Sequence, residues 1–255
     1  MGMLNGKTIL VTGIYTERSI AYACAKLAAE EGANLIYTAF GRQRKTTEVI
    51  IGRLPKKGPI LELDARSQEH FDTLSERLLE HTNRIDGIIH CISASKPEAV
   101  GENFLHAKWD DIETSLRVSG TSLQALAAAC LPLMSKGGSI VGVTLDSTPV
   151  WPIYGYAGVG KATYESVNRY LAYHLGKHGI RSNLIACGPL QNPTVSKIQD
   201  INSTEGVWES RAPLGWSWED LSPVSKAVIA MLTDWFPATT GEIIHVDGGY
   251  HVMGM

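Results

Sequence analysis

The sequence has no excess of positive charge. Its 255 residues include 23 Lys and Arg against 26 Asp and Glu, which gives a formal net charge of −3 at neutral pH. Proteins that bind nucleic acids without sequence preference need clustered cations to neutralise phosphates. The composition therefore disfavours that class and is typical of an ordinary globular protein.

Paired cysteines and metal-ligating patterns are also missing. We interpret the cysteines, which lie far apart with no C-x-x-C spacing, as small apolar residues in a reducing compartment, the cytoplasm, rather than as disulfides or metal ligands. The eight histidines form no H-E-x-x-H or similar pattern, so we expect no metal site. The four cysteines are Cys24, Cys91, Cys130 and Cys187.

No hydrophobic run is long enough to cross a membrane. The longest, Leu123–Met134, falls short of the roughly 20 residues that a spanning helix needs, and Pro132 interrupts it. The N-terminal segment MGMLNGKTILVTG lacks the basic region, long apolar stretch and cleavage site of a signal peptide. No Pro/Ser/Gly-rich or charged linker divides the chain, so we expect one domain over residues 1–255.

The sequence does contain an alternation of short apolar runs with longer helical segments. Unbroken runs such as TILVT suit strands that are covered on both faces. The alternation predicts a three-layer α/β fold, a doubly wound parallel sheet of about seven strands, whose ligands bind beyond the carboxyl ends of the strands. The expected strands are Thr8–Thr12, Asn34–Thr38, Ile60–Leu63, Gly87–Cys91, Ser139–Thr144, Arg181–Ala186 and Glu242–Val246. The expected helices are Ile20–Glu31, Thr46–Leu54, Glu69–His81, Trp109–Met134, Tyr156–His178 and Ser222–Asp234.

The turn after the first expected strand carries signals of a nucleotide site. Gly13 allows the backbone to approach a ligand closely, and Ser19 either caps the following helix or bonds a phosphate. The N-terminus of that helix would present free N–H groups and partial positive charge to a pyrophosphate. The usual G-x-G-x-x-G motif is absent, because only one glycine falls in this turn. Alone, the turn is weak support for a dinucleotide.

Residues at the ends of the next two strands fit an adenine. Phe40 is placed to stack on the base and Asp64 to accept a hydrogen bond from its amino group; alternatively, Phe40 belongs to the core and Asp64 caps the next helix. The acidic residue that commonly binds the ribose 2′-hydroxyl is missing. Basic residues stand nearby, which would accept a 2′-phosphate, attract an acidic partner or form a solvated helix face. These are Arg42, Arg44, Lys45, Arg53, Lys56 and Lys57.

Tyr154 and Lys161 stand near the start of the longest expected helix. They would share a face if the helix began before Tyr154, since they differ by roughly 20°, whereas Tyr156 lies about 140° from Lys161. Seven helical residues span about 10 Å, so both groups would contact one extended ligand rather than each other. The ammonium would bind a ribose, and the phenol would donate to an oxygen that gains negative charge. The alternative is a packed tyrosine and an exposed helical lysine.

Four segments together resemble a known family. They are the G-x5-S-I-A turn at Gly13–Ala21, the Tyr-x6-Lys pair at Tyr154–Lys161, the segment RSNLIACGP at Arg181–Pro189 and the ending TGEIIHVDGG at Thr240–Gly249. In this order they resemble the NADH-dependent enoyl-[acyl-carrier-protein] reductases, a divergent branch of the short-chain dehydrogenase/reductases. Ordinary members of that superfamily carry T-G-x3-G-x-G and Tyr-x3-Lys, and their tyrosine would fall at Ala157. The resemblance covers nearly the whole chain.

The resemblance implies a Rossmann-type domain, usually a homotetramer, that reduces the 2,3 double bond of an enoyl thioester on acyl carrier protein or coenzyme A. Hydride from NADH would add to the β-carbon while Tyr154 and Lys161 stabilise the enolate. Residues 191–210 would form the substrate-binding segment. The implied cofactor-binding residues are Gly13, Ile14, Ser19 and Ile20 near the pyrophosphate, Asp64 and Ala65 at the adenine, Ile92 and Ser93 at the adenosine side, Lys161 at the nicotinamide ribose, Leu190 at the carboxamide and Asn192 beside the pyrophosphate.

Two departures from the family pattern bear on the substrate. The family usually has an aromatic residue about ten positions before the active tyrosine, beside the nicotinamide, where this chain has Thr144 and Leu145. Its absence removes a wall of the pocket and points to an unusual acyl substrate or a specialised pathway. The family commonly has Thr where this chain has Asn192, and Asn still hydrogen-bonds a phosphate.

Other functions and a second cofactor stay open from the sequence. A carbonyl reductase is disfavoured because no serine falls within Val141–Val143, although Thr144 is a possible substitute. A non-catalytic NAD(P)-binding sensor or scaffold would keep the nucleotide turn and would not need Tyr154. The family favours NADH, while Arg42 and Arg44 leave NADPH open.

Overall fold

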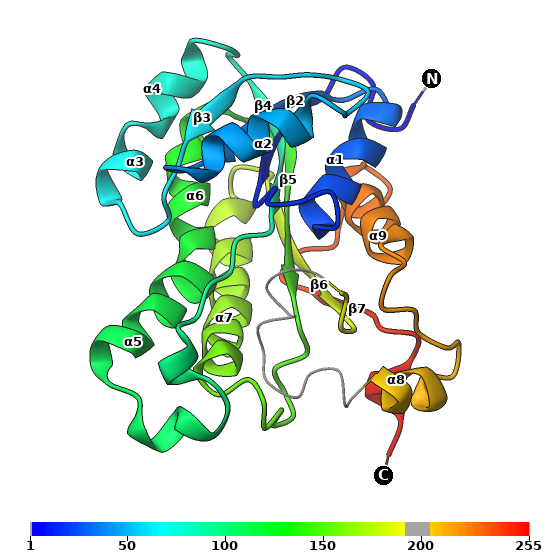
Figure 1. The fold of residues 1–255 in the computed structure, drawn as a ribbon. Helices are drawn as coiled ribbons and strands as arrows, with labels where there is room; N and C mark the ends of the chain where they lie inside the picture. Colours follow the sequence, from blue (N-terminus) through cyan, green and yellow to red (C-terminus); the bar gives the residue numbers. More distant parts are fainter. Residues whose placement is uncertain (1, 192–204, 255) are drawn as a thin grey trace.

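A seven-stranded sheet forms the centre of the structure, a computed structural model that describes residues 2–191 and 205–254 (Figure 1). Neighbouring strands are parallel throughout, in the order β3-β2-β1-β4-β5-β6-β7. The crossover from β3 to β4 reverses the direction of winding and places a switch point between β1 and β4, where such sheets bind ligands. The strands are β1 (Thr8–Thr12), β2 (Asn34–Ala39), β3 (Ile60–Glu62), β4 (Ile85–His90), β5 (Met134–Thr144), β6 (Arg181–Cys187) and β7 (Ile243–Val246).

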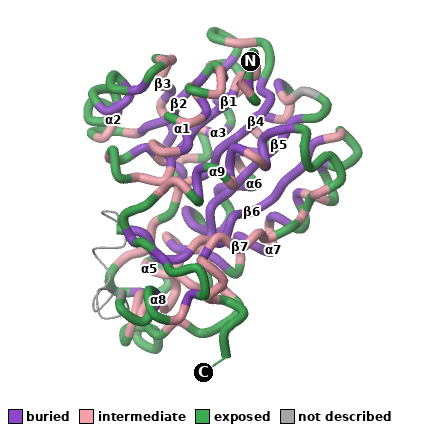
Figure 2. Tube along the Cα trace, turned by 90° about the vertical axis from the view of Figure 1, so that its right-hand side faces the viewer, coloured by how far each residue is buried: buried purple, intermediate pink, exposed green. Residues whose placement is uncertain are grey.

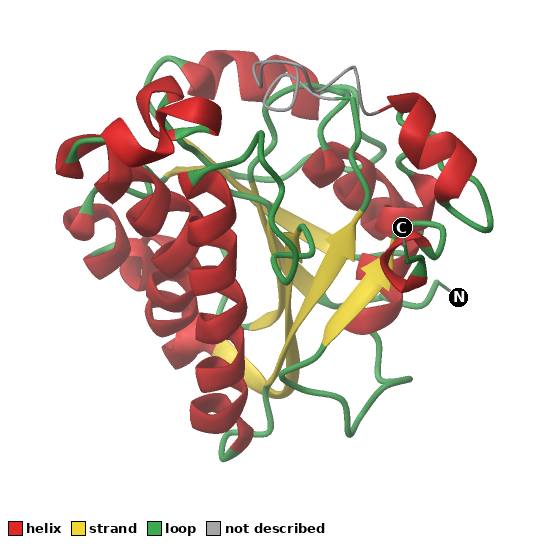
Figure 3. Cartoon of the chain, turned by 90° about the horizontal axis from the view of Figure 1, so that it is seen from below, coloured by secondary structure: helices red, strands yellow, loops and turns green. Residues whose placement is uncertain are grey.

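Helices cover both faces of the sheet, which confirms the predicted three-layer fold (Figures 1 and 3). One face carries α1 (Ile20–Glu30), α2 (Gln43–Ile51) and α9 (Ser222–Leu232). The other carries α3 (Gln68–Asp72), α4 (Leu74–Leu79), α6 (Ser122–Cys130) and α7 (Tyr156–Gly176). None of the helices in the described ranges combines the length and the apolar character needed to cross a membrane.

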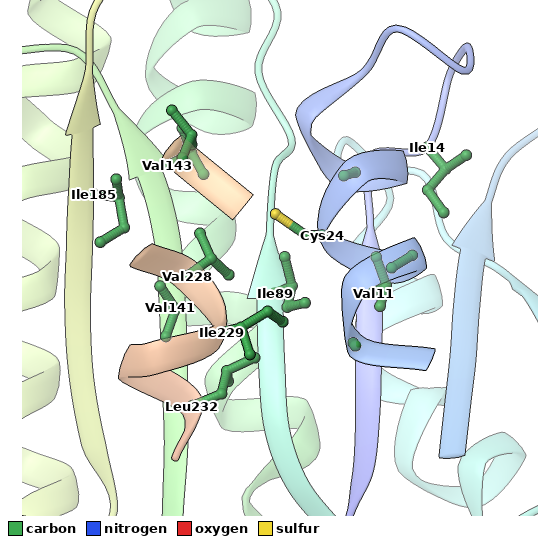
Figure 4. Close-up of a cluster of buried hydrophobic side chains, with 14 of the residues drawn as sticks. Val11, Ile14, Cys24, Ile89, Val141, Val143, Ile185, Val228, Ile229 and Leu232 are labelled. Carbon is green, nitrogen blue, oxygen red and sulfur yellow. The ribbon is translucent and has the colours of Figure 1, made fainter. Parts of the chain in front are cut away.

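The core sits in two layers because successive strand residues point to opposite faces. Ile9 and Val11 of β1 face α1 and α9, while Leu10 between them faces the α6 and α7 side. Figure 4 shows the first layer, in which Cys24 of α1 and Val228 of α9 pack over the central strands. The strands β1, β4 and β6 are almost wholly buried (Figure 2), and each fully buried Leu, Ile or Val stabilises the fold by about 1.5–3 kcal/mol.

The prediction of one helix over Trp109–Met134 is wrong. The segment divides into α5 (Trp109–Thr114), a π-helical stretch η3 (Ser115–Thr121), α6 and a short 3-10 turn η4 (Leu131–Leu133), and Met134 already belongs to β5. Gly120 permits a close approach to α7, since a Cβ there would lie 2.9 Å from Thr163 Cγ2. Pro132 ends the helical run because it lacks a backbone N–H.

Other expected bounds also change. The expected helix Glu69–His81 breaks at Thr73 into α3 and α4, and the second helix begins three residues earlier than expected, at Gln43. Short elements that carry too few residues for a periodic pattern were not predicted. They are η1 (Pro97–Ala99), η2 (Gly101–His106), α8 (Glu205–Arg211) and η7 (Tyr250–Val252).

Candidate active site

The carboxyl ends of the central strands bring the predicted site residues to one edge of the sheet. Thr12 at the end of β1 pairs with His90 at the end of β4, and Thr144 at the end of β5 pairs with Ala186 of β6. The residues that follow these strands therefore lie next to one another. These are the first turn from Gly13, the segment from Cys91, the loop from Leu145 and the segment from Gly188.

Gly13 is required by close packing as well as by its backbone conformation. Its φ is +87°, in the left-handed region that favours glycine, and a Cβ there would lie 2.3 Å from the carbonyl oxygen of Cys91. The turn therefore packs directly against Cys91, which follows β4.

Ser19 is the N-cap of α1, so the capping alternative is confirmed. Its hydroxyl accepts a hydrogen bond from Tyr22 N at 3.2 Å and donates to the carbonyl of Thr16 at 2.7 Å. Ile20 is the first residue of the helix. Ile14 is buried, and its carbonyl accepts a hydrogen bond from Thr47 of α2 at 3.1 Å. The turn is thus held from two helices and sets the positive end of the α1 dipole at the sheet edge.

Phe40 and Asp64 meet through a residue that was not predicted. The Arg66 guanidinium donates to the Asp64 carboxylate at 2.6 Å and lies 5.8 Å from the centre of the Phe40 ring. This pairing holds the pKa of Asp64 below its usual value. Asp64 does not cap the next helix, because Ser67 does so. Ala65 between them is buried.

The segment after β4 is held by the π-helical stretch η3. Ser119 accepts a hydrogen bond from Ala94 N at 2.9 Å, and its hydroxyl lies 3.0 Å from that of Ser93. Ile92, one residue earlier, packs against the core layer that includes α6 and α7. The irregular turn of η3 brings Ser119 to this segment, in line with the frequent occurrence of π-helical turns at functional sites.

Lys161 is a buried cation rather than an exposed helical residue. Only 9 % of its surface is exposed, and its Nζ donates to the carbonyl of Val143 on β5 at 2.9 Å. Nζ also lies 4.6 Å from the centre of the Tyr164 ring. Burial lowers the pKa of Lys161 to about 8. An ammonium has three N–H donors, and Val143 is the acceptor recorded for it among the described residues.

Tyr154 lies in the turn before α7 and not on the helix itself. The helix begins at Tyr156, because Gly155 has φ +49° and ψ −125°, far from helical values. The condition for a shared helical face, a helix that begins before Tyr154, is therefore not met. Tyr154 is partly buried, and burial raises the pKa of its phenol to about 12, so the hydroxyl remains a donor at neutral pH.

Leu190 and a group of aromatic residues complete this edge of the sheet. Leu190 is buried, the carbonyl of Pro189 accepts from Trp216 Nε1, and Gln191 N donates to the carbonyl of Trp218, both at 2.7 Å. Asn192, with most of the segment 191–210, lies outside the described residues.

Sequence reasoning missed an aromatic cluster that joins three distant segments. Trp208 of α8 stacks on Tyr250 with ring centres 3.8 Å apart and on Trp151, in the turn before Tyr154, at 5.8 Å. All three pack against the core layer that contains Leu190. Because the three residues are far apart in the sequence, only the unusual number of tryptophans, six, signalled them.

The residues fit a dinucleotide. The glycine turn at Gly13, the capped N-terminus of α1 and the buried Lys161 ammonium lie along one edge of a parallel sheet. An anion suits the first two, and a pair of ribose hydroxyls suits the third. Fold and site together define an α/β oxidoreductase of the short-chain dehydrogenase/reductase type.

Comparison with known proteins narrows this class. Residues 13–251 match the family model described as enoyl-(acyl carrier protein) reductase. The chain is 42 % identical to an enoyl-[acyl-carrier-protein] reductase [NADH] of Mycobacterium avium and 44 % identical to that of Mycolicibacterium smegmatis, each over 97 % of both chains. It is 36 % identical to the FabI reductase [NADH] of Bacillus subtilis, over 98 % of this chain and 97 % of the relative. The chain belongs to the enoyl-[acyl-carrier-protein] reductase family.

Proposed function

We propose that this protein is an NADH-dependent enoyl thioester reductase that acts on the 2,3 double bond of acyl chains carried by acyl carrier protein. The observation that supports this most directly is the burial of Lys161 beside β5 in a chain whose Tyr-x6-Lys spacing and full-length similarity belong to that family. The relatives are named for the same reaction and cofactor.

Tyr154 and Lys161 have different roles at the reacting end of the substrate. Bound NADH would supply the hydride that adds to the β-carbon of the substrate. The Tyr154 phenol donates a hydrogen bond to the thioester oxygen, which becomes an enolate oxygen as the hydride arrives. The Lys161 ammonium would hold the ribose hydroxyls of NADH and would add a positive field at the same oxygen. Protonation at the α-carbon completes the reduction.

Three of the six basic residues after β2 have partners within the protein. Arg44 lies 3.9 Å from Glu62, Arg53 pairs with Glu17, and Lys56 donates to Asn34 Oδ1 at 2.6 Å. These pairings support the solvated-face interpretation for the three residues, and the preference for NADH rests on the relatives, which are named for that cofactor.

The contacts of Thr144 disfavour the carbonyl reductase alternative, which needs this residue in place of a serine. Its hydroxyl lies 3.0 Å from the carbonyl of Leu145 and 3.3 Å from Glu165 Oε1, so its single proton is shared between two acceptors within the protein. Thr144 is therefore poorly placed to stand in for the serine that carbonyl reductases use.

We also propose a cytoplasmic homotetramer, with one interface formed by α6 and α7. An apolar groove on these helices is lined by Val167, Tyr170 and Leu171, and Tyr170 and Tyr173 expose most of their rings. Exposed apolar patches of this kind commonly mark interfaces between subunits.

The test of the reaction is a substrate comparison followed through the absorbance of NADH. Purified protein is mixed with NADH and either crotonyl and longer 2-enoyl thioesters or the matched 3-oxoacyl thioesters. The proposal predicts oxidation of NADH with the enoyl substrates alone. Oxidation with the 3-oxoacyl substrates would identify a carbonyl reductase, and NADH binding without turnover would identify a sensor.

A further inference from the structure

A second buried charge, Glu165, lies one helical turn after Lys161 on α7. Only 7 % of its surface is exposed, and no Lys, Arg or His of the described residues lies within ion-pair distance of its carboxylate. Burying an ionised carboxylate is costly unless hydrogen bonds compensate it. The burial of Glu165 therefore requires compensating interactions beyond the packing of α7.

Hydrogen bonds from the loop after β5 compensate this charge. The Ser147 hydroxyl donates to Glu165 Oε2 at 2.5 Å, and Ser147 N donates to Oε1 at 3.3 Å. The Thr144 hydroxyl lies 3.3 Å from Oε1. Charged acceptors form the stronger hydrogen bonds in proteins, so Glu165 fixes both ends of the segment from Thr144 to Ser147.

That segment carries Thr144 and Leu145, which stand where the family usually has an aromatic side chain beside the nicotinamide. Lys161 holds the same stretch one residue earlier, through the carbonyl of Val143. Two α7 side chains, one turn apart, therefore fasten the end of β5 and the loop that follows it.

Glu165 also acts electrostatically on Lys161, from four residues further along α7. The thiols that act on Lys161 from the ends of β4 and β6, Cys91 and Cys187, have their pKa values raised to about 12 by burial and stay neutral. Burial lowers the pKa of His90 on β4 to about 3 and raises that of Tyr164 on α7, so these groups are neutral as well.

Tyr154, in the turn before α7, is neutral for the same reason, because burial raises its pKa to about 12. Among the described groups that act electrostatically on Lys161, Glu165 is the carboxylate.

We propose that Glu165 is a positioning residue for the reductase: its carboxylate anchors the loop that carries Leu145 and supplies the negative charge that stabilises the buried Lys161 ammonium. The role of Glu165 in positioning Leu145 and the nicotinamide ribose rests on the proposed function. The electrostatic coupling between Glu165 and Lys161 does not depend on that function.

Two variants separate the charge of Glu165 from its hydrogen bonds. Glu165→Gln removes the charge and keeps an amide of the same shape, whose oxygen still accepts from Ser147 N while the Ser147 hydroxyl reverses to accept from the amide NH2. Ser147→Ala removes the loop hydroxyl and keeps the charge. Both are compared with the wild-type protein.

The first measurement is the dissociation constant for NADH against pH, by nucleotide fluorescence. Wild-type affinity falls as pH rises through the pKa of Lys161, about 8, because the ammonium loses its proton. In Glu165→Gln the fall moves to lower pH by about half a unit to one unit, since an opposite charge has been removed. In Ser147→Ala the fall in NADH affinity stays at the same pH as in the wild-type protein. Equal midpoints in wild type and Glu165→Gln would overturn the electrostatic part of the proposal.

The second measurement is the KM for a 2-enoyl thioester. Ser147→Ala raises this KM several-fold at unchanged NADH affinity, because the loop beside the substrate loses its anchor; an unchanged KM would overturn the positioning part. This variant keeps the proposal testable if Glu165→Gln does not fold. A wild-type protein without enoyl reduction would refute the proposed function, while the NADH titration would still report the coupling of Glu165 with Lys161.

Discussion

At the scale of single residues, the site depends on a few close contacts that a substitution would disrupt. Gly13 and the Cys91 carbonyl are one such pair, and Lys161 with the Val143 carbonyl is another. In each pair, the partner atom is a backbone carbonyl oxygen. Such contacts constrain the position more tightly than side-chain contacts do, because a strand in the middle of a sheet cannot move aside.

Gly13→Ala tests the first pair. The variant combines left-handed strain, about 1–2 kcal/mol, with a clash against Cys91, so we expect a larger loss of unfolding free energy than strain alone gives, together with weaker NADH binding. Gly6→Ala is the matched control, because Gly6 has φ +77° and open space around its Cβ position. Urea unfolding and NADH titration measure both effects. Equal losses in the two variants would contradict the close packing.

Residue identities were partly visible in the sequence. Gly13, Ser19 and Lys161 follow from their places after strands or at the start of helices, and Phe40 and Asp64 follow from their places after the second and third strands. Arg66 was missed, because its pairing with Asp64 and its contact with Phe40 depend on how two separate loops meet. The helical-face argument for Tyr154 failed at Gly155, whose positive φ no periodicity reveals.

At the scale of elements, a buried polar network ties the central strand β4 to α6 and α7. His90 lies 2.9 Å from the Ser122 hydroxyl through Nε2 and 2.7 Å from the Tyr164 hydroxyl through Nδ1. The ring is fully buried, and Lys161 is close by. A neutral imidazole satisfies both hydroxyls, whereas a second proton would place an uncompensated charge in the core.

This network predicts a stability loss in acid. The pKa of His90 is about 3 in the folded protein and about 6.5 in an unfolded chain, so between these values the unfolded state binds the extra proton. The unfolding free energy therefore falls as pH drops below about 6.5, by at most about 1.4 kcal/mol per pH unit from this group. Denaturant unfolding at pH 7 and pH 5 should show a larger difference for wild type than for His90→Gln. Parallel pH dependence would show that the imidazole does not remain neutral.

The order of strands and helices was predictable, while their interruptions were not. Apolar runs indicated all seven strands, because central parallel strands are buried on both faces. The break in Trp109–Met134 was hidden, because η3 continues the apolar spacing of a regular helix and its extra residue per turn is set by contacts with α7 at Gly120 and with the segment after β4 at Ser119.

At the scale of the whole molecule, the doubly wound topology gathers the site from segments spread along the chain. The first turn, the end of β5, the start of α7 and the segment after β6 meet because parallel strands end at a common edge. The outer face of α6 and α7, away from the sheet, is left for contact between subunits in the proposed tetramer.

Assembly is tested by placing a charge on that outer face. Tyr170→Glu puts a carboxylate on the apolar groove, where pairing of two copies would bury it, so we expect the proposed tetramer to dissociate to a smaller species. Val49→Glu, on the exposed surface of α2 across the sheet, should leave the assembly unchanged. Light scattering after size exclusion gives both masses. A monomeric wild type, or a tetrameric Tyr170→Glu, would refute this interface.

The central claim is that the Tyr154 phenol stabilises the enolate while Lys161 holds the nucleotide, and one variant tests it most directly. Tyr154→Phe keeps the ring and removes the donor, so its kcat for a 2-enoyl thioester should fall by roughly 10²-fold or more, the usual cost of one lost oxyanion donor, at unchanged NADH affinity. The measurement is single-turnover oxidation of NADH with saturating enoyl thioester, beside an NADH titration of the same preparation. Turnover equal to wild type would remove Tyr154 from the reaction and contradict the account.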